Sequence, residues 1–358
     1  MTLPGAGDPQ PDAGQMSGAE AFLKETVPTL LVGAVGAWLF WLIGFPAAVL
    51  TGPAAAVSVA TLLGMRTAIS PLLRDVVFLV IGVSIGSTVT PEVIATALAW
   101  PISLAILVVT LVLVVLAAKA VLMRGFGYDR MTALLSATPG HLSYVLGLST
   151  DLAADVPRVA LVQTVRVLLL TLLVPVLIAL WGVEGTAYLT DQGAISWLAL
   201  ALTFPLALGL GLVFQRLGVP APILLGGMAV SAIGHGADLT PGAMPFWLTT
   251  LAFLGMGALI GTRFRGLDRR GLVAALWAGI VTTLIACAVA ALGAVVAAEL
   301  IGLPPAALLL AFAPGGIEVM AALAVETGLE PALVAAHHVF RLLALTVLVP
   351  VMIGRRRA

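Results

Sequence analysis

The sequence predicts an all-α polytopic membrane protein made of two homologous repeats of about 175 residues each. Hydrophobic residues make up 61% of its 358 residues, charged residues make up only 9%, and the mean hydropathy is +1.16. Soluble domains carry roughly a quarter charged residues, so a soluble core could not bury this much apolar surface. The apolar runs far exceed ten residues and do not alternate with polar residues, which excludes a closed β-barrel.

The charge balance and the single cysteine exclude several other classes of protein. The formal net charge is zero, so nothing favours a nucleic-acid partner. Cys287 is the only cysteine, which rules out an intramolecular disulfide and a cysteine-based metal site. We expect Cys287 to be a packing residue, and we expect no cofactor and no metal.

The chain divides into a tail and two membrane repeats. Residues 1–22 are rich in Pro, Gly, Ala, Asp and Gln, and they lack the basic and apolar regions of a signal peptide. We therefore predict a disordered N-terminal tail at 1–22. The first membrane repeat is predicted at 23–183 and the second at 184–358, with no linker domain between them.

Each repeat contains six apolar segments. The first repeat has them at 27–43, 45–64, 75–91, 97–122, 131–149 and 157–181, and the second at 194–214, 219–234, 246–262, 271–301, 305–325 and 331–354. Two small-xxx-small patterns, Gly82 to Gly86 and Gly257 to Gly261, indicate tight helix packing.

Two of these segments are broken at their centres. Pro139-Gly140 interrupts 131–149, and Pro314-Gly315 interrupts 305–325. Proline removes an amide donor and glycine loosens a helix. In lipid, such breaks persist only where protein or a water-filled cavity satisfies the freed backbone groups. A duplicated break of this kind indicates a binding site, and the alternative is a kinked packing helix.

The region around each break is repeated without a gap. The first copy runs from Pro139-Gly140-His141-Leu142-Ser143 through Gln163 and Arg166 to Pro175, and the second runs from Pro314-Gly315-Gly316-Ile317-Glu318 through His338 and Arg341 to Pro350. Together the copies resemble the duplicated module of the AbrB family of bacterial membrane proteins, over roughly Gly44 to the C-terminus. Members of that family carry the labels regulator and ammonia monooxygenase. The resemblance implies the bacterial inner membrane, and it carries over no substrate and no catalytic residue.

The basic residues predict how the repeats are oriented. Cytoplasmic loops carry an excess of Lys and Arg, so the C-terminal residues 355–357 and the loop 263–270 are expected inside. The basic positions of the first half, at 66–74 and 119–130, are also expected inside, whereas 184–191 lacks Lys and Arg and is expected outside. This pattern favours inverted repeats, each with five crossings and one re-entrant hairpin at the Pro-Gly break, and cytoplasmic termini. A parallel arrangement with twelve crossings is the alternative.

Arg166 and Arg341 are the first candidate site residues. Thirteen uncharged residues follow Arg341 before Arg355, which places Arg341 about 21 Å of helix from that end, inside a hydrocarbon core about 30 Å thick. A buried arginine needs a partner or water. One interpretation is a pair of cations that bind an anionic substrate in a central cavity. The other is that each arginine bonds the open carbonyls of the neighbouring hairpin and never touches substrate.

The remaining candidates lie around these two arginines. Glu318 is a candidate proton carrier, with a static ion pair to arginine as the alternative. Gln163 and His338 precede the arginines by one turn and should share a face with them. His337 and His338 point in different directions and suit no shared metal, and His235 is expected in a loop. The predicted substrate-binding residues are Pro139, Gly140, His141, Ser143, Gln163, Arg166, Pro314, Gly315, Gly316, Glu318, His338 and Arg341.

These features predict a secondary transporter of a small anion, for example a carboxylate, coupled to protons through Glu318 or His338. The expected partners are the lipid bilayer, the anion and a coupling ion, and a homo-oligomer is left open. One alternative is a membrane sensor that affects gene expression indirectly, because the sequence has no signalling or DNA-binding motif. A monooxygenase is expected least, since it would need several His and carboxylate ligands for a metal and the chain has four His.

Overall fold

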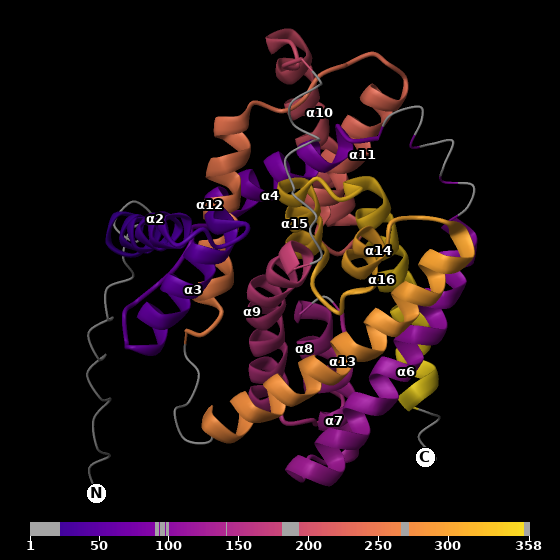
Figure 1. The fold of residues 1–358 in the computed structure, drawn as a ribbon. Coiled ribbons are helices and arrows are strands. Elements are labelled where there is room, and N and C mark those ends of the chain that lie inside the picture. The colour runs from indigo at the N-terminus through magenta and orange to yellow at the C-terminus, as the bar shows by residue number, and fades with distance from the viewer. Residues whose placement is uncertain are drawn as a thin grey trace, which may run out of the picture.

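The computed structural model describes residues 22–89, 93, 97, 100–140, 142–180, 193–265 and 272–353, and these residues are almost entirely helical (Figure 1). The predicted tail at 1–22 lies outside the described residues, except for Phe22. Within the described ranges, six helices are long and apolar enough to cross a membrane: Lys24–Leu42, Trp100–Phe126, Val156–Leu180, Trp197–Arg216, Leu276–Ile301 and Pro331–Ile353. The chain is therefore a helical, multi-pass membrane protein.

The first half contains several shorter segments beside its long helices. The order is η1 (Phe22–Thr26), α2 (Val27–Leu42), α3 (Ala48–Leu62), α4 (Pro71–Gly86), α6 (Trp100–Phe126), α7 (Arg130–Ala137), α8 (Leu142–Asp151) and α9 (Val156–Leu180). The Pro139-Gly140 break separates α7 from α8. The segment predicted at 131–149 is thus two short helices joined by a non-helical turn.

The second half follows the same order. Its helices are α10 (Trp197–Arg216), α11 (Pro222–Gly236), α12 (Phe246–Thr262), α13 (Leu272–Ile301), α14 (Pro305–Phe312), α15 (Ile317–Thr327) and α16 (Pro331–Ile353). The helices α11, α12, α14, α15 and α16 begin 174 or 175 residues after α3, α4, α7, α8 and α9. The Pro314-Gly315 break separates α14 from α15, as the first break separates α7 from α8.

Local sequence explains where several helices begin. Ser70 caps α4 by accepting a hydrogen bond from the Leu73 amide at 3.3 Å, and Asp129 caps α7 by accepting from the Met131 and Thr132 amides at 3.0 Å. Such side chains replace hydrogen-bond acceptors that the first turn of a helix lacks. In contrast, α14 follows Pro304 and has no side-chain cap.

The helices form two groups, and each group contains helices from both halves (Figure 1). The first group consists of α2, α3, α4, α10, α11 and α12, and the second of α6, α7, α8, α9, α13, α14, α15 and α16. In the first group, α4 packs on α11 and α3 packs on α12. In the second group, α6 lies along α13, which also packs on α9.

Glycines permit the close packing within the first group. A Cβ added at Gly86 of α4 would lie 2.6 Å from the Ser231 Cβ of α11, and one added at Gly261 of α12 would lie 2.6 Å from the Val57 Cβ of α3. Gly82 and Gly257 similarly face backbone carbonyls of α11 and α3. The packing interpretation of both small-xxx-small patterns is confirmed.

The first broken segment ends close to where it begins. The Asp155 amide, just after α8, donates a hydrogen bond to the Thr132 hydroxyl in the first turn of α7, at 2.9 Å. Arg158, at the start of α9, lies over the ring of Tyr128, which precedes α7, with 5.4 Å between the guanidinium carbon and the ring centroid. The α7–α8 segment therefore has the geometry of a hairpin that turns at Pro139-Gly140.

The expectation that His235 lies in a loop is wrong. His235 is in the last turn of α11 and is buried. Its Nδ1 lies 2.9 Å from the Ser231 carbonyl one turn earlier, and its Nε2 lies 3.1 Å from the Gly242 carbonyl. These contacts hold the imidazole inside the protein at the end of the helix.

Candidate functional site

A cavity of about 690 Å³ lies between the two helix groups, at the level of the two breaks. From the first group it is lined by the start of α4, the connection from α10 to α11, and the end of α12. From the second group it is lined by the starts of α8 and α15 and by the middles of α9 and α16. The charged and polar residues of the lining, with the glycines at the two breaks, include Arg74, Asp75, Arg263, Gly140, Gln163, Arg166, Gly316, Glu318 and Arg341.

Arg341 holds the second break together. It lies in α16, and its side chain is 2% exposed. Its Nη1 donates a hydrogen bond to the Ala313 carbonyl at 2.6 Å, and its Nη2 donates to the Gly315 carbonyl. The end of a helix leaves carbonyls without partners, and Arg341 satisfies two of them at the break between α14 and α15.

Arg166 holds the first break in a different way. It lies in α9 and is 6% exposed. Its Nη1 and Nη2 are both 3.4 Å from the Thr138 carbonyl, and its Nη2 also donates to the side-chain oxygen of Gln163. Gln163 in turn donates its amide to the carbonyls of Leu135 and Thr138, each at 2.9 Å. Gln163 and Arg166 together thus bond the carbonyls at the first break, whereas Arg341 alone does so at the second.

Both arginines also line the cavity, and each has one donor that the hairpins do not use. The Nε atoms of Arg166 and Arg341 are buried and have no hydrogen-bond partner among the described residues. A buried donor without a partner costs free energy. Each arginine thus bonds its hairpin through its terminal nitrogens and also lines the cavity, and binding of an anion there stays a prediction.

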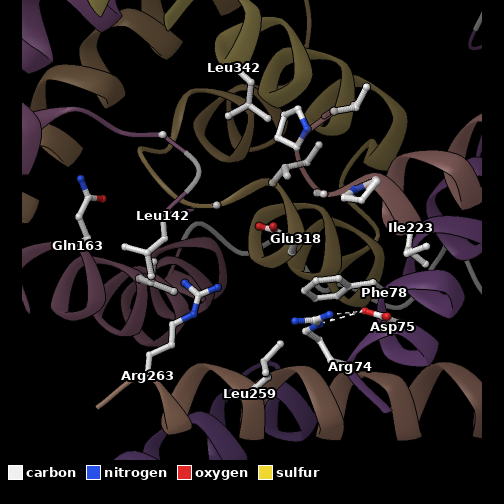
Figure 2. Close-up of a pocket in the computed structure, with 18 of the residues that line it drawn as sticks. Arg74, Asp75, Phe78, Leu142, Gln163, Ile223, Leu259, Arg263, Glu318 and Leu342 are labelled. Atoms are coloured by element: carbon white, nitrogen blue, oxygen red, sulfur yellow. Dashed lines mark hydrogen bonds and ion pairs between the residues drawn. The ribbon is translucent and has the colours of Figure 1, made fainter. Parts of the chain in front are cut away.

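Glu318 lies in the first turn of α15 and is 5% exposed. In Figure 2 its carboxylate lies near the centre of the cavity. The charges of Arg263 and Arg341 are close enough to attract it. Gly316 leaves room for this side chain, because a Cβ at that position would lie 2.9 Å from a Glu318 carboxylate oxygen.

An ion pair lies at the wall formed by α4. Arg74 donates hydrogen bonds to the Asp75 carboxylate at 2.9 and 3.0 Å, and both side chains are partly exposed (Figure 2). This pair is locally neutral. The start of α15 also borders the cavity, and its N-cap residue is Gly316, which supplies no side-chain cap.

The structure brings together half of the predicted site residues. Gly140, Gln163, Arg166, Gly316, Glu318 and Arg341 line the cavity. Pro139, Pro314 and Gly315 form the breaks themselves without being among the lining residues. His141 and the side chain of Ser143 lie outside the described part of the structure.

The two neighbouring histidines have separate partners. His338 is fully buried and away from the cavity lining, and its Nδ1 lies 3.0 Å from the Val334 carbonyl. His337 instead has its Nε2 2.8 Å from the Ser103 hydroxyl of α6. Within the described ranges, no group of three or more His, Cys, Asp and Glu side chains is arranged to hold a metal ion.

Sequence reasoning missed the wall of the cavity that the first helix group supplies. The sequence marks Arg74 and Arg263 only as loop charges and does not single out Asp75 or Phe78, yet all four line the cavity. The available signal was their place at helix ends: Arg74 lies in the first turn of α4, and Arg263 directly follows α12. Nothing in the sequence spacing indicates that these two ends meet.

Comparison with known proteins identifies the relatives of this chain. The profile of a family described as "Transition state regulatory protein AbrB" matches residues 49–356. An uncharacterised protein of Bacillus subtilis (strain 168), YhjN, is 29% identical over 291 residues, which cover 76% of this chain and 75% of the relative. A provisionally named regulator of Escherichia coli (strain K12), AbrB, is 27% identical over 317 residues, which cover 86% of this chain and 89% of the relative.

Proposed function

The chain belongs to the AbrB family, and from the site in its membrane helices we propose that it is a secondary transporter of a small anionic solute. The observation that carries the proposal is the cavity between the two helix groups, which is lined by a buried arginine from each of the helices that follow the two broken hairpins. Cationic side chains at membrane depth beside interrupted helices are typical of substrate sites in transporters.

The helix directions support an inverted repeat. The cavity is lined by the beginning of α4, at Arg74, and by the end of α12, at Leu259 and Arg263. These two helices begin 175 residues apart, at 71 and 246. Equivalent helices that present opposite ends to one cavity are expected when the second repeat is upside down relative to the first.

The hairpins support the same arrangement. Re-entrant α7–α8 and α14–α15 segments would give each half an odd number of crossings, which an inverted repeat requires. In Figure 1, α7 and α8 lie below α14 and α15, so the two hairpins come from opposite ends of the second helix group. In this proposal the termini are cytoplasmic, and the cavity faces the cytoplasm because its Arg74 and Arg263 belong to basic loops.

Transport would follow from movement of one helix group relative to the other. The cavity lies between the groups, so sliding or rocking them would open it to the two sides in turn. The groups already differ in what they supply: the second group carries both hairpins, and the first group forms the opposite wall. Glu318 is the proposed proton carrier among the lining residues, with His338 as the other candidate.

Counterflow in proteoliposomes tests the proposal without knowledge of the coupling ion. Vesicles that contain the purified protein are loaded with one unlabelled anion, such as propionate, succinate, citrate, sulfate or phosphate, and uptake of the same labelled anion is measured. The proposal expects uptake of at least one anion above that of protein-free vesicles and its loss in Arg166→Gln. A folded protein that exchanges no anion from this panel would contradict it.

A membrane regulator is the second candidate function, and the name of the E. coli relative favours it. In a regulator, the cavity would bind a signal molecule, and the resulting movement of the helix groups would alter the binding of a partner. The two functions differ in one measurement: a regulator binds the anion in detergent but gives no counterflow, whereas a transporter gives both.

A further inference from the structure

The charged lining of the cavity is unbalanced. Arg74 and Asp75 neutralise one another at 2.9 Å. Arg166, Arg263 and Arg341 remain, and Glu318 is the only carboxylate to set against these three among the lining residues described. With Glu318 ionised, two of these positive charges have no counter-charge among the described residues of the lining. Inside a membrane protein such an excess is costly, and a ligand with two negative charges would remove it.

The two Nε donors that have no partner among the described residues belong to different helices, α9 and α16. The Nε of Arg166 lies in the helix that holds the first break, and the Nε of Arg341 lies in the helix that holds the second. Both guanidinium groups are held in place through their terminal nitrogens, so neither can turn freely toward a single small ion. The positive charges of these arginines repel each other. This arrangement suits two acceptor groups on one molecule, one for each arginine.

The space and its other walls suit an organic linker between those groups. A cavity of about 690 Å³ is much larger than an inorganic anion requires. Leu142, Val167, Leu259 and Leu342 add apolar surface to the lining. Apolar walls with a few convergent charged groups are typical of sites for small organic ligands.

We propose that the cavity binds a small dicarboxylate, with one carboxylate beside Arg166 and the other beside Arg341. This inference rests on the proposed anion site and gives it a substrate class. Arg263 supplies the further positive charge that offsets Glu318. A monocarboxylate would supply one negative charge against two positive ones, and a compact dianion such as sulfate would leave most of the cavity volume empty.

Calorimetric titration in detergent at pH 7 tests the assignment, with succinate, propionate and sulfate as the probes. Succinate is expected to bind about tenfold or more tightly than either of the others, since it alone satisfies both charge-assisted contacts. Equal or tighter binding of propionate or sulfate would overturn the dicarboxylate assignment. Because binding is measured without transport, counterflow of propionate together with such a result would leave the transport proposal standing.

Variants of Arg263 and Glu318 test the charge balance. Arg263→Gln lowers the excess to one positive charge, so it is expected to reduce the preference for succinate over propionate by about tenfold. Arg263→Lys keeps the charge and is the matched control, with the preference retained. Glu318→Gln raises the excess to three, and citrate is then expected to gain affinity relative to succinate. An unchanged succinate-to-propionate ratio in folded Arg263→Gln would overturn the proposal, and binding of no anion by folded wild-type protein would overturn the anion site as well.

Discussion

The two hairpins meet the same need with different side chains. At the second break, Arg341 alone bonds two carbonyls, those of Ala313 and Gly315. At the first break, Arg166 reaches the single Thr138 carbonyl at 3.4 Å, and Gln163 supplies the shorter bonds to Leu135 and Thr138. The second hairpin therefore depends on its arginine for its shape. The first has a glutamine to keep its shape, which leaves Arg166 freer to act on a ligand.

The largest expected difference is in stability. Arg341→Gln removes two charge-assisted hydrogen bonds to buried carbonyls, which should cost about 3 kcal/mol or more. Arg166→Gln should cost about half as much, because Gln163 still bonds the hairpin. Thermal unfolding in detergent, followed by tryptophan fluorescence, measures both. Arg216→Gln, at the exposed end of α10, is the matched control and should change little. A larger loss in Arg166→Gln than in Arg341→Gln would reverse the comparison.

Because Gln163 and Arg166 bond the same carbonyl at the first break, we expect their contributions to stability to be coupled. Gln163 bonds Arg166 directly and shares the Thr138 carbonyl with it. A double-mutant cycle of Gln163→Leu with Arg166→Gln is expected to show about 1 kcal/mol of coupling in the free energy of unfolding. The cycle of Gln163→Leu with Arg341→Gln should give less than about 0.5 kcal/mol, since the two side chains have no hydrogen-bond partner in common. Equal coupling in both cycles would mean that the hairpins are not separate units.

The glycines at the two breaks should differ in their effect on ligand binding. A Cβ at Gly316 would lie 2.9 Å from a Glu318 carboxylate oxygen, whereas one at Gly140 would lie 3.3 Å from a Val145 methyl carbon. Gly316→Ala therefore displaces a charged group in the cavity, and we expect about a fivefold change in anion affinity, roughly 1 kcal/mol. Gly140→Ala should change affinity by less than about twofold, because a methyl contact adjusts at little cost. Titration with the same anion compares them, and a larger effect at Gly140 would speak against the central place of Glu318.

The smallest expected difference depends on pH. Burial of Asp129 opposes ionisation, but hydrogen bonds from Thr132 and from the Met131 amide outweigh it and hold the pKa of Asp129 below its ordinary value of 3.8. Because the folded pKa is the lower one, the ionised cap stabilises α7 above about pH 4 and loses this effect as the pH falls through the folded pKa. The α14 helix has no such cap.

Hydrogen exchange of α7 and α14 at pH 3 and pH 6 checks this prediction. Protection of α7 should fall in acid by up to about 1 kcal/mol, with no matching loss in α14. Asp129→Asn keeps a capping side chain and should abolish the acid effect. Acid loosening of α7 that persists in Asp129→Asn would assign the pH dependence to another group.

Features that depend on neighbouring residues could be predicted from the sequence. A Pro-Gly pair interrupts a helix locally, so the residues at 139–140 and 314–315 are enough to locate both breaks. The two arginines are found for a similar reason, because an isolated charge in an apolar run must have a partner. Their bonds to the hairpin carbonyls are confirmed, whereas their contact with an anion stays a prediction.

Features that depend on which helices meet could not be predicted in this way. Helix α4 packs on α11 and α3 packs on α12, so each pair joins helices from different halves. The sequence of one repeat does not indicate which helix of the other repeat it will contact. Arg263 therefore resembles an ordinary loop residue in the sequence, although the end of α12 places it beside the cavity. His235 is a different case, since its partner, the Gly242 carbonyl, is only seven residues away along the chain.

We conclude that residues from both halves line one cavity, and we propose that an anion binds there. Protection of introduced cysteines from a thiol reagent tests this most directly. Leu142 of α8 and Leu342 of α16 both line the cavity (Figure 2). In a Cys287→Ser background, Leu142→Cys and Leu342→Cys are treated with a membrane-impermeant thiol reagent from each side of oriented vesicles. The account predicts that both cysteines react from the cytoplasmic side and that succinate slows both reactions. Reaction of the two cysteines from opposite sides, or no slowing of either by succinate or any other anion of the panel, would contradict it.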